Sequence, residues 1–459
     1  SSLLPYCPSS PTIMLLWEGR MSNRPMQKLL SASLMGFLFW GQPEAAIQPL
    51  QELKWQETAF FQLPQEPNPT AEQIVKDYLK TLAAKGFDPQ RQGVWLQSDL
   101  TRLAVRNGDS PLSAASLTKI ATTVAALQQW ELDFQFETQF YGTGEVKDGV
   151  LQGDLIVVGG DDPIFVWEEA IAIGNALNEL GIRKITGNLL VSDNFFMNFT
   201  PNPALGGDRL KVGMNRNLWS REVKTSHALM PPGTPQPKVE LLGRVMVQKN
   251  PPTNGRLLLR HQSLTLRQII KQMNIYSNNV IAEVLAEALG GGEAVAKLAA
   301  VAAGVPPKEI QLINGSGLGV ENRISPHATT AMLIALERQL EGDSTGVEDL
   351  FPVVGRDNLG TVRDRDLPPN TAMKTGTLAR VSALAGILPT KEYGWVWFAI
   401  INEGGDIVEL RAQQDRLLQN LSQAWGISSL PAAKGDNGKF GDPSRISGVE
   451  NDAVAQRDD

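Results

Sequence analysis

The sequence predicts an α/β protein whose chain is interrupted by an inserted β-rich domain. Helices and short strands alternate up to about residue 134, after which strand-like segments dominate. Helical spacing of apolar residues returns at about residue 263. Three strand candidates separated by short turns follow, at 371–378, 381–389 and 394–403. We therefore expect one α/β domain built from two separated segments, with the insert between them.

The composition excludes several classes of function. The 459 residues suffice for two domains, and a content of 42% hydrophobic and 20% charged residues is ordinary for a soluble globular protein. The net charge is −7 with no basic block, so we expect no nucleic-acid partner. The single cysteine, Cys7, lies in a segment that we expect to be removed, which excludes disulfides and thiolate chemistry from the mature chain. The three histidines (His227, His261 and His327) are far apart and form no His-Glu-x-x-His motif, so we expect no metal and no cofactor.

Residues 1–46 are interpreted as a leader and a secretory signal peptide. Arg24 and Lys28 precede an apolar stretch at 29–40, and the small residue Ala45 with its neighbour offers a cleavage point. The apolar stretch is too short to span a bilayer as a stable helix. We therefore expect an exported protein, in the periplasm if the cell has two membranes, with no stable membrane span after the signal is cleaved.

Residues 47–140 are expected to form the first segment of the main domain. After a lead-in rich in Pro and Gln, Thr70 and Gln73 predict a capping box for a helix that ends near Lys85. Two antiparallel strands are predicted next, at 93–98 and 101–108.

The inserted β-rich domain is expected over 141–261. Its predicted strands lie at 135–146, 150–160, 186–196 and 239–247, with a helix at 167–180. Apart from the last strand, the proline-rich residues 200–260 are expected to be irregular.

The second segment of the main domain is expected over 262–428, followed by a disordered tail at 429–459. Its predicted helices lie at 263–274, 280–289, from Pro326 onward, and at 406–425. Ser325 before Pro326 is a favoured helix start. The tail is polar and rich in Gly, Asp and Pro.

Ser116 and Lys119 are the first candidate catalytic pair. Residues at i and i+3 share a helix face, so the hydroxyl and the amine can meet. An unassisted serine is a weak nucleophile at neutral pH, and a lysine can activate it only as a neutral amine, which requires burial or a nearby like charge. The apolar run that follows Lys119 could supply the burial. Taken alone, the pair is better explained as an N-cap serine and a surface lysine.

The tripeptide Ser-Asn-Asn at 277–279 falls between two predicted helices. In an extended loop the side chains of Ser277 and Asn279 point to the same side. Asn and Ser also favour turns and helix ends, so the same residues are compatible with a purely structural break.

The tetrapeptide Lys-Thr-Gly-Thr at 374–377 lies on a predicted strand. A strand edge that carries Lys374 and the hydroxyls of Thr375 and Thr377 can bind a carboxylate. Gly376 would let a ligand approach the backbone. The alternative is an edge strand whose lysine protects against aggregation.

The three motifs follow the order Ser-x-x-Lys, Ser-x-Asn and Lys-Thr-Gly, a set shared by β-lactamases and penicillin-binding proteins. Two other stretches are similar to these motifs. A Ser-Asp-Asn at 192–194 ends a predicted strand, where no loop between helices is expected. A Lys-Thr-Ser at 224–226 lacks both the glycine and the strand pattern. We therefore prefer 277–279 and 374–376.

With these motifs the chain resembles the D-alanyl-D-alanine carboxypeptidase/endopeptidases of the penicillin-binding protein 4 type, peptidase family S13. The resemblance runs from about Gly93 to Gly404 and also rests on the stretches at 153–163, 185–196, 314–318 and 360–365. It implies a β-lactamase/DD-peptidase-like catalytic domain, in which an antiparallel sheet is flanked by helices and accompanied by a helical subdomain. Two features depart from the family: Asn314 stands where Asp is usual, and the insert is short.

The resemblance also implies a role for each motif residue. Ser116 is the expected nucleophile on the carbonyl between two terminal D-alanines, with Lys119 as its base. Ser277 is expected to pass a proton to the departing D-alanine. The residues expected to bind substrate are Asn279, Lys374, Thr375, Gly376 and Thr377. Peptidoglycan stem peptides are the implied substrates, and β-lactam antibiotics the implied acylating inhibitors.

Two other functions remain open from the sequence. A β-lactamase of the class A type needs a glutamate that activates the deacylating water, and Glu309 with Asn314 approaches that motif one residue out of register. A non-catalytic wall-binding protein could keep the same fold, although three intact motifs argue against it. Carboxypeptidase and endopeptidase activity both attack a D-alanyl carbonyl, so the sequence does not separate them.

Overall fold

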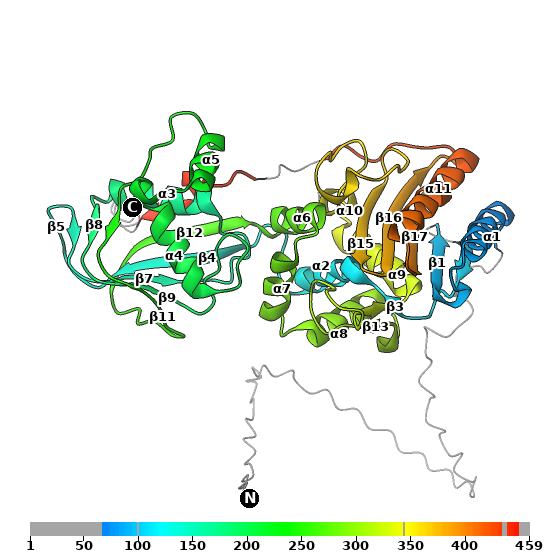
Figure 1. Ribbon diagram of the computed structural model, residues 1–459, viewed down its shortest axis with the longest axis horizontal. Helices are drawn as coiled ribbons and strands as arrows, with labels where there is room; N and C mark the ends of the chain where they lie inside the picture. Colours follow the sequence, from blue (N-terminus) through cyan, green and yellow to red (C-terminus); the bar gives the residue numbers. More distant parts are fainter. Residues whose placement is uncertain (1–66, 99–100, 343–344, 434–437, 449–459) are drawn as a thin grey trace, which may run out of the picture. The chain divides into compact units, whose positions relative to one another are not determined.

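The protein is described here by a computed structural model that covers residues 67–98, 101–342, 345–433 and 438–448. Its central element is a five-stranded antiparallel sheet in the order β15-β16-β17-β1-β2 (Figure 1). The strands are β1 (Gln92–Gln97), β2 (Arg102–Arg106), β15 (Ala372–Leu378), β16 (Val381–Thr390) and β17 (Gly394–Glu403). All five coincide with predicted strands, and β15 lies at an edge of the sheet.

Hydrophobic cores cover both faces of this sheet. Because successive side chains of a strand point to opposite faces, Leu384 and Ala385 on β16 enter different cores. Leu384 packs with helices α1 (Pro69–Ala84) and α11 (Ile407–Trp425). Ala385 belongs to the larger core on the opposite face, which several helices build.

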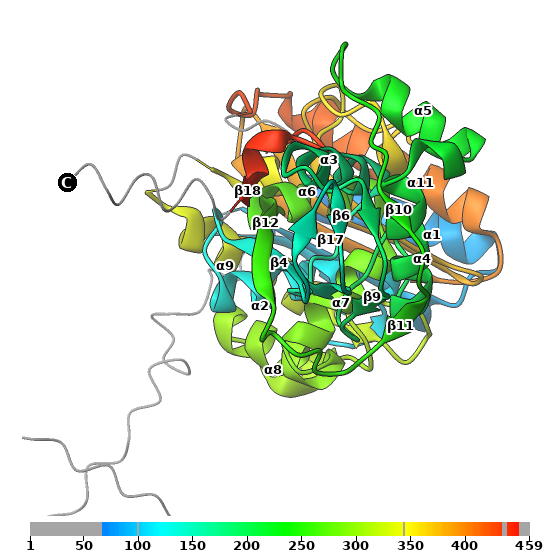
Figure 2. The same ribbon diagram turned by 90° about the vertical axis from the view of Figure 1, so that its left-hand side faces the viewer.

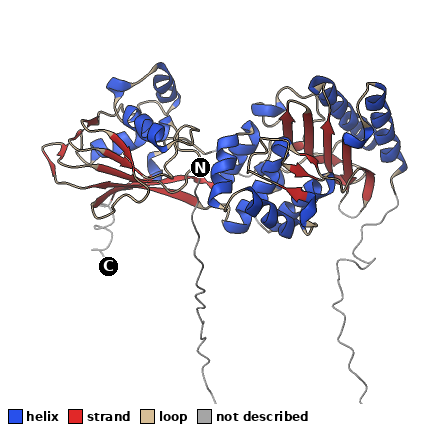
Figure 3. Cartoon of the chain, turned by 60° about the horizontal axis from the view of Figure 1, so that its bottom comes forward, coloured by secondary structure: helices blue, strands red, loops and turns tan. Residues whose placement is uncertain are grey.

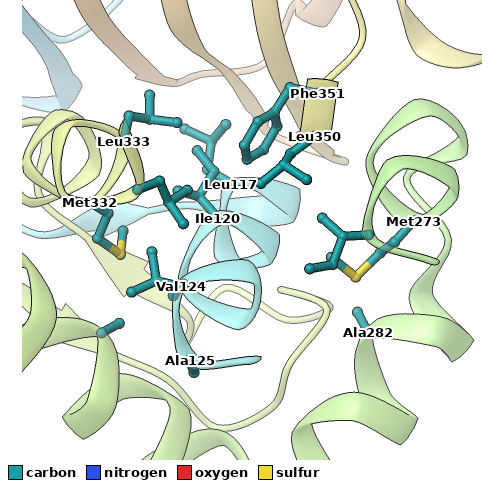
Figure 4. Close-up of a cluster of buried hydrophobic side chains, with 14 of the residues drawn as sticks. Leu117, Ile120, Val124, Ala125, Met273, Ala282, Met332, Leu333, Leu350 and Phe351 are labelled. Atoms are coloured by element: carbon teal, nitrogen blue, oxygen red, sulfur yellow. The ribbon is translucent and has the colours of Figure 1, made fainter. Parts of the chain in front are cut away.

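The helices of this larger core surround α2, the helix that follows Ser116. They are α2 (Thr118–Gln129), α6 (Leu266–Tyr276), α7 (Asn279–Ala288), α8 (Gly292–Ala303), α9 (Pro326–Leu340) and α10 (Val347–Leu350). Figure 4 shows Ile120 and Val124 of α2 among side chains such as Met273, Met332 and Phe351. Every residue of α2 up to Leu127 is buried, so this helix is enclosed on all sides instead of presenting one apolar stripe.

A small three-stranded sheet in the order β13-β14-β3 supports the start of α2. Its strands are β3 (Leu112–Ser113), β13 (Ile310–Gln311) and β14 (Arg323–Ile324). The ladder continues beyond β3, where the N–H of Ala114 donates to the carbonyl oxygen of Asn322 at 2.9 Å. The segment before Ser116 is thus fixed to a loop that lies much later in the chain.

The inserted region contains two further sheets, in the orders β11-β9-β7-β4-β12-β18 and β10-β8-β6-β5. Its strands are β4 (Gln135–Gly142), β5 (Val146–Lys147), β6 (Val150–Leu151), β7 (Leu155–Val158), β8 (Lys184–Ile185), β9 (Leu189–Val191), β10 (Glu240–Leu241), β11 (Val245–Val247), β12 (Arg256–Thr265) and β18 (Ile446–Gly448). The strands that lead into and out of the insert, β4 and β12, form one antiparallel pair (Figure 2). The region has a hydrophobic core of its own, built around Phe140 and Leu189.

Three helices accompany these sheets, so the insert is α/β and not only β-rich (Figure 3). They are α3 (Trp167–Glu179), α4 (Pro203–Gly213) and α5 (Arg221–Leu229). The expectation of irregular structure over 200–260 was wrong for the last two. Pro203 begins α4 after the capping residue Asn202, and Ser220 caps α5, so residues that suggested loops instead start helices.

Two further expectations are corrected by the structure. Helix α1 is capped by Asn68, whose Oδ1 accepts the N–H of Ala71 at 2.9 Å, and not by a box built on Thr70. The tail was expected to be disordered from residue 429, yet residues 446–448 pair with β12 as β18. Composition suggested disorder there because few of these residues are apolar. The pairing with β12 is made by backbone groups, which composition does not report.

The expected leader and signal at 1–46 lie outside the described residues, as do the last residues, 449–459. Most of the lead-in that was expected before α1 lies outside them too. No helix in the described ranges is both long and apolar enough to cross a bilayer.

Candidate active site

Ser116 lies in a tight turn immediately before α2. Residues Ala115–Leu117 form a short 3-10 helix, and Ala115 adopts a left-handed backbone with φ of 46°. For a residue other than glycine this conformation costs about 1–3 kcal/mol and persists where surrounding structure enforces it. The turn leaves Ser116 partly exposed, while both of its chain neighbours are buried.

Lys119 lies one turn further along α2, and its side chain is fully buried. Its Nζ lies 3.0 Å from Ser116 Oγ, 2.8 Å from Asn279 Oδ1 and 2.8 Å from the carbonyl oxygen of Ser316. Burial lowers the pKa of Lys119 to about 7, an effect that the carboxylate of Glu283 partly opposes. A large share of molecules therefore carries a neutral amine at this position near pH 7.

The three neighbours determine how a neutral Lys119 amine is oriented. Such an amine has two hydrogens and one lone pair. The carbonyl oxygens of Asn279 and Ser316 can only accept, so they take the two hydrogens. The lone pair is left for the hydroxyl hydrogen of Ser116, which is the arrangement that a general base requires.

Ser277 and Asn279 lie at the break between α6 and α7. Ser277 ends α6 with a left-handed backbone, φ of 52°, and Asn278 caps α7 with its side chain. The break is therefore also a helix stop and start, as the residue types allowed. It directs the two flanking side chains to different lysines. Ser277 Oγ lies 2.9 Å from the Nζ of Lys374, while Asn279 contacts Lys119.

Lys374 extends from β15 on the same face as its cross-strand partner Ala385, and its side chain is fully buried. Its Nζ donates to Ser277 Oγ and, at 2.8 Å, to the carbonyl oxygen of Thr375. Burial, and then the charge of Lys119, lower the pKa of Lys374 well below that of a free lysine. Burial is thus the main cause of the lowered pKa of both amines, as the apolar run after Lys119 suggested for the first of them.

Two glycines let the flanking segments pack directly against the Ser116 turn. A Cβ on Gly376 would lie 2.8 Å from the carbonyl oxygen of Ala114 and 3.1 Å from the backbone nitrogen of Ser116. Gly317, with φ of 83°, would bring a Cβ to 1.8 Å from the carbonyl oxygen of Ala115. The sequence suggested that Gly376 lets a ligand approach the backbone. In the structure, it is the turn that holds Ser116 that makes this close approach.

The two threonines of β15 differ in exposure. The hydroxyl of Thr375 is buried and donates to the hydroxyl of Thr361 at 2.7 Å. Thr377 is exposed, and its hydroxyl oxygen accepts from Arg411 Nη2 at 2.8 Å. Side chains two apart on a strand share a face, so both hydroxyls lie on the face opposite to Lys374.

Sequence reasoning missed four groups at this site: the Ser316 carbonyl, Glu283, Thr361 and Arg411. The carboxylate of Glu283 accepts from the backbone nitrogens of Gly315 at 3.1 Å and Ser316 at 3.2 Å, which holds the carbonyl that meets Lys119. A backbone acceptor leaves no residue-type signal. The sequence of 314–318 indicates only a family resemblance. In the structure, Asn314 folds this loop by accepting from the N–H of Gly317 at 2.9 Å.

Two residues of the rejected alternatives, Ser192 and Glu309, have structural partners of their own. In the insert, Ser192 Oγ donates to Asn194 Oδ1 at 2.6 Å and accepts from the backbone of Gly159. Glu309 accepts from Ser325 Oγ at 2.5 Å and His327 Nδ1 at 3.0 Å. Its carboxylate is therefore engaged at the start of α9.

One group of metal-ligand atoms occurs near that helix start. Atoms of Asp109, Glu309 and His327 lie within 4.8 Å of one another. The hydrogen bonds that Glu309 accepts from Ser325 and His327 account for their approach, and Asp109 is largely exposed. We assign no metal to this group.

The structure thus brings together side chains from three distant parts of the chain: Ser116 and Lys119, then Ser277 and Asn279, then Lys374. The sequence model of the D-Ala-D-Ala carboxypeptidase 3 (S13) family matches residues 90–205 and 236–424, which include all of them. The chain belongs to this family. As a member it is a serine peptidase of the D-Ala-D-Ala carboxypeptidase class, so the family expected from the sequence is confirmed.

Individual relatives agree with this assignment. The chain is 23% identical to "D-alanyl-D-alanine carboxypeptidase DacB" of Haemophilus influenzae over 68% of this chain and 85% of that protein. Among solved structures it resembles Bd3459, titled a predatory peptidoglycan endopeptidase from Bdellovibrio bacteriovorus, with a TM-score of 0.65, 22% identity, and coverage of 78% of this chain and 98% of that one. Penicillin binding protein 4 from H. influenzae aligns with a TM-score of 0.58 and 20% identity, covering 75% of this chain and 98% of that one. The expected fold class is confirmed by these likenesses.

Proposed function

We propose that the protein is a serine DD-peptidase that cleaves the bond between two terminal D-alanines of peptidoglycan stem peptides through an acyl-enzyme on Ser116. The observation that carries the proposal is the 3.0 Å contact between the Ser116 hydroxyl and the buried amine of Lys119, whose pKa is about 7. Membership of the S13 family and the activity named for DacB support the same function.

In the proposed first step, Ser116 Oγ adds to the carbonyl carbon of the penultimate D-alanine while the hydroxyl proton moves to Lys119. The new C–O bond creates a tetrahedral oxyanion. The backbone N–H groups of Ser116 and Thr377 are the proposed donors to it. The close packing of Gly376 on the backbone nitrogen of Ser116, which brings the two segments together, supports this pairing.

The oxyanion then collapses, the C–N bond breaks, and the terminal D-alanine leaves as an amine that needs a proton. Ser277 is proposed to supply it, and the proton held by Lys119 replaces the one that Ser277 gives up. The 2.9 Å contact between Ser277 Oγ and the amine of Lys374 supports this role, because it holds the hydroxyl in place. Water subsequently adds to the ester carbonyl, and the oxygen of Ser116 leaves with a proton.

The remaining motif residues are proposed to hold the substrate. Asn279 uses its side-chain amide hydrogens for the acyl portion, since its Oδ1 accepts from Lys119. The hydroxyls of Thr375 and Thr377, on the edge strand β15, are proposed to bind the free carboxylate from the face opposite to Lys374, with Thr375 exchanging its bond to Thr361 for one to the substrate. β-Lactams would acylate Ser116 in the same way, a proposal supported by a relative, Bd3459, whose structure is titled as penicillin G acylated.

The β-lactamase alternative depended on Glu309 as the acid that activates water. That carboxylate is occupied by Ser325 and His327 at the start of α9, which disfavours the alternative. A non-catalytic wall-binding protein would not need the Ser116–Lys119 contact or a lysine with a pKa of about 7.

Export to the periplasm is proposed with this function, since the substrate lies outside the cytoplasm. The signal-like pattern within residues 1–46 supports it. Penicillin labelling of separated cell fractions tests this location, and we expect the labelled mature protein in the periplasmic fraction.

Intact-mass analysis after incubation with a fluorescent penicillin tests the proposed nucleophile. We expect one adduct per chain, on the peptide that contains Ser116, and no adduct on a Ser116→Ala variant. Full D-alanine release by Ser116→Ala would falsify the assignment. Rapid turnover of the penicillin, instead of a lasting adduct, would favour the β-lactamase alternative. Uncross-linked and cross-linked muropeptides then distinguish carboxypeptidase from endopeptidase activity.

A further inference from the structure

Arg411 lies on the face of α11 that packs against the sheet. Three residues further along this helix, Gln414 donates to the carbonyl oxygen of Ser382 and accepts from its hydroxyl, both at 3.0 Å. Residues three apart share a helix face, so Arg411 is directed toward the same surface. Ser382 is the cross-strand partner of Thr377, and such partners share a sheet face. The helix therefore places Arg411 beside Thr377, with Nη2 2.8 Å from Oγ1.

The guanidinium of Arg411 has no carboxylate partner in the part of the chain that the structure describes. Its bond to Thr377 uses one of five N–H donors and meets a neutral hydroxyl. The contrast with Arg365 is direct, because that arginine pairs with Asp415 of the same helix at 2.6 Å and is 3% exposed. Arg411 is only partly buried, and its bond to Thr377 leaves the other donors of the guanidinium for a ligand.

Lys374 cannot easily supply the cation that a carboxylate site needs. Its amine is fully buried and directed to Ser277 and to the carbonyl oxygen of Thr375, on the face opposite to the hydroxyl of Thr377. Burial and the charge of Lys119 also lower its pKa, so its charged form is disfavoured. Arg411, which lies beside Thr377, can supply the positive charge that Lys374 does not provide.

We infer that Arg411, together with Thr377, binds the free carboxylate of the residue after the scissile bond and so selects peptides that carry this charge. The inference deepens the proposed function and rests on it. A planar guanidinium matches a carboxylate with two parallel hydrogen bonds, whereas hydroxyls alone would bind a neutral carboxamide nearly as well. Arg411 is thus assigned as a specificity-determining residue supplied by α11.

The test compares a peptide ending in D-Ala-D-Ala with the same peptide ending in a carboxamide. For the acid, Arg411→Ala is expected to lower kcat/KM about 10- to 100-fold, the range for a lost hydrogen bond to a charged group, mainly through KM. For the carboxamide, it is expected to change kcat/KM less than about threefold. Arg411→Lys should recover part of the preference. Arg416→Ala, on the same helix with only a 3.5 Å contact to Gln413, is the matched control and should retain it.

Two outcomes would overturn the inference: an acid preference that survives in Arg411→Ala, or an equal loss for acid and carboxamide, which would mean that Arg411 only positions Thr377. A binding measurement separates this failure from failure of the proposed function. Titration calorimetry on Ser116→Ala, with and without Arg411→Ala, compares the affinities of both peptides and requires no turnover. If the wild-type chain releases no D-alanine, the proposed function fails, while the affinities still decide whether Arg411 recognises the carboxylate.

Discussion

At the scale of residues, the site depends on burying two amines next to two serines. Lys119 and Lys374 are each fully buried and each contact one serine hydroxyl, Ser116 and Ser277 respectively. In water a lysine is charged at neutral pH and cannot accept a proton. Burial penalises the charged form, so the surroundings convert Lys119 from a cation into a base.

This conversion predicts a pH dependence of acylation. Because Lys119 must be neutral and its pKa is about 7, the acylation rate should rise up to about tenfold per pH unit below pH 7 and level off above about pH 8. The measurement is the second-order rate of fluorescent penicillin labelling between pH 5 and 9. Lys119→Arg, whose guanidinium stays protonated, is the control and should label slowly at every pH. A flat wild-type profile would contradict the role of Lys119.

At the scale of elements, β15 and the loop at 314–318 must approach the turn before α2 more closely than side chains permit. Gly376 and Gly317 provide this approach, and the turn itself holds Ala115 in a left-handed conformation. Reacting groups lose much of their rate when displaced by about 1 Å. The close packing therefore positions Ser116 as much as its own helix does.

Substitution of Gly376 by alanine tests this packing. The added Cβ would meet the carbonyl oxygen of Ala114 at 2.8 Å, so strand and turn must separate. We expect the acylation rate to fall about 10- to 100-fold, with a smaller effect on the unfolding midpoint. Gly405→Ala is the control, since a Cβ there meets nothing within 4 Å, and it should acylate at the wild-type rate. Normal labelling of Gly376→Ala would show that the approach is dispensable.

At the scale of the whole molecule, the C-terminal part of the chain returns to the inserted region. Strand β18 pairs with β12, and Arg445 donates to Glu169 at 2.6 Å and to the carbonyl oxygen of Gln262 at 2.7 Å. Glu169 also lies 2.8 Å from His261, and both side chains are buried. The insert is therefore completed by residues that follow the last helix of the main domain.

Removal of the Arg445 side chain should destabilise the insert. Arg445→Ala leaves a buried carboxylate with one partner fewer, and we expect a loss of about 3 kcal/mol, the low end for a broken buried pair, since His261 still contacts Glu169. Urea unfolding followed by circular dichroism measures it. Arg363→Ala breaks a pair whose side chains are 74% and 82% exposed, and should cost at most about 1 kcal/mol. Equal effects of the two substitutions would refute a structural role for this segment.

Much of the main domain could be predicted because its elements carry strong local patterns. The strands of the five-stranded sheet, the helix after Ser325 and the helix at 406–425 were found close to their observed bounds. Helices α4 and α5 were missed because Pro203 and the prolines around them suggest loops, although proline at a first helical position is favourable. The folded C-terminal strand was missed because backbone pairing with β12 leaves no pattern in composition.

The residue types of the site and their order can be read from local patterns: a serine and a lysine three apart, a Ser-x-Asn and a Lys-Thr-Gly. Which groups meet depends on the packing of distant segments. The Ser316 carbonyl and Asn279 take the hydrogens of Lys119, and Arg411 from α11 contacts Thr377. These contacts join segments far apart in the chain. Their distances and burial follow from tertiary packing, so the neighbouring residue types do not predict them.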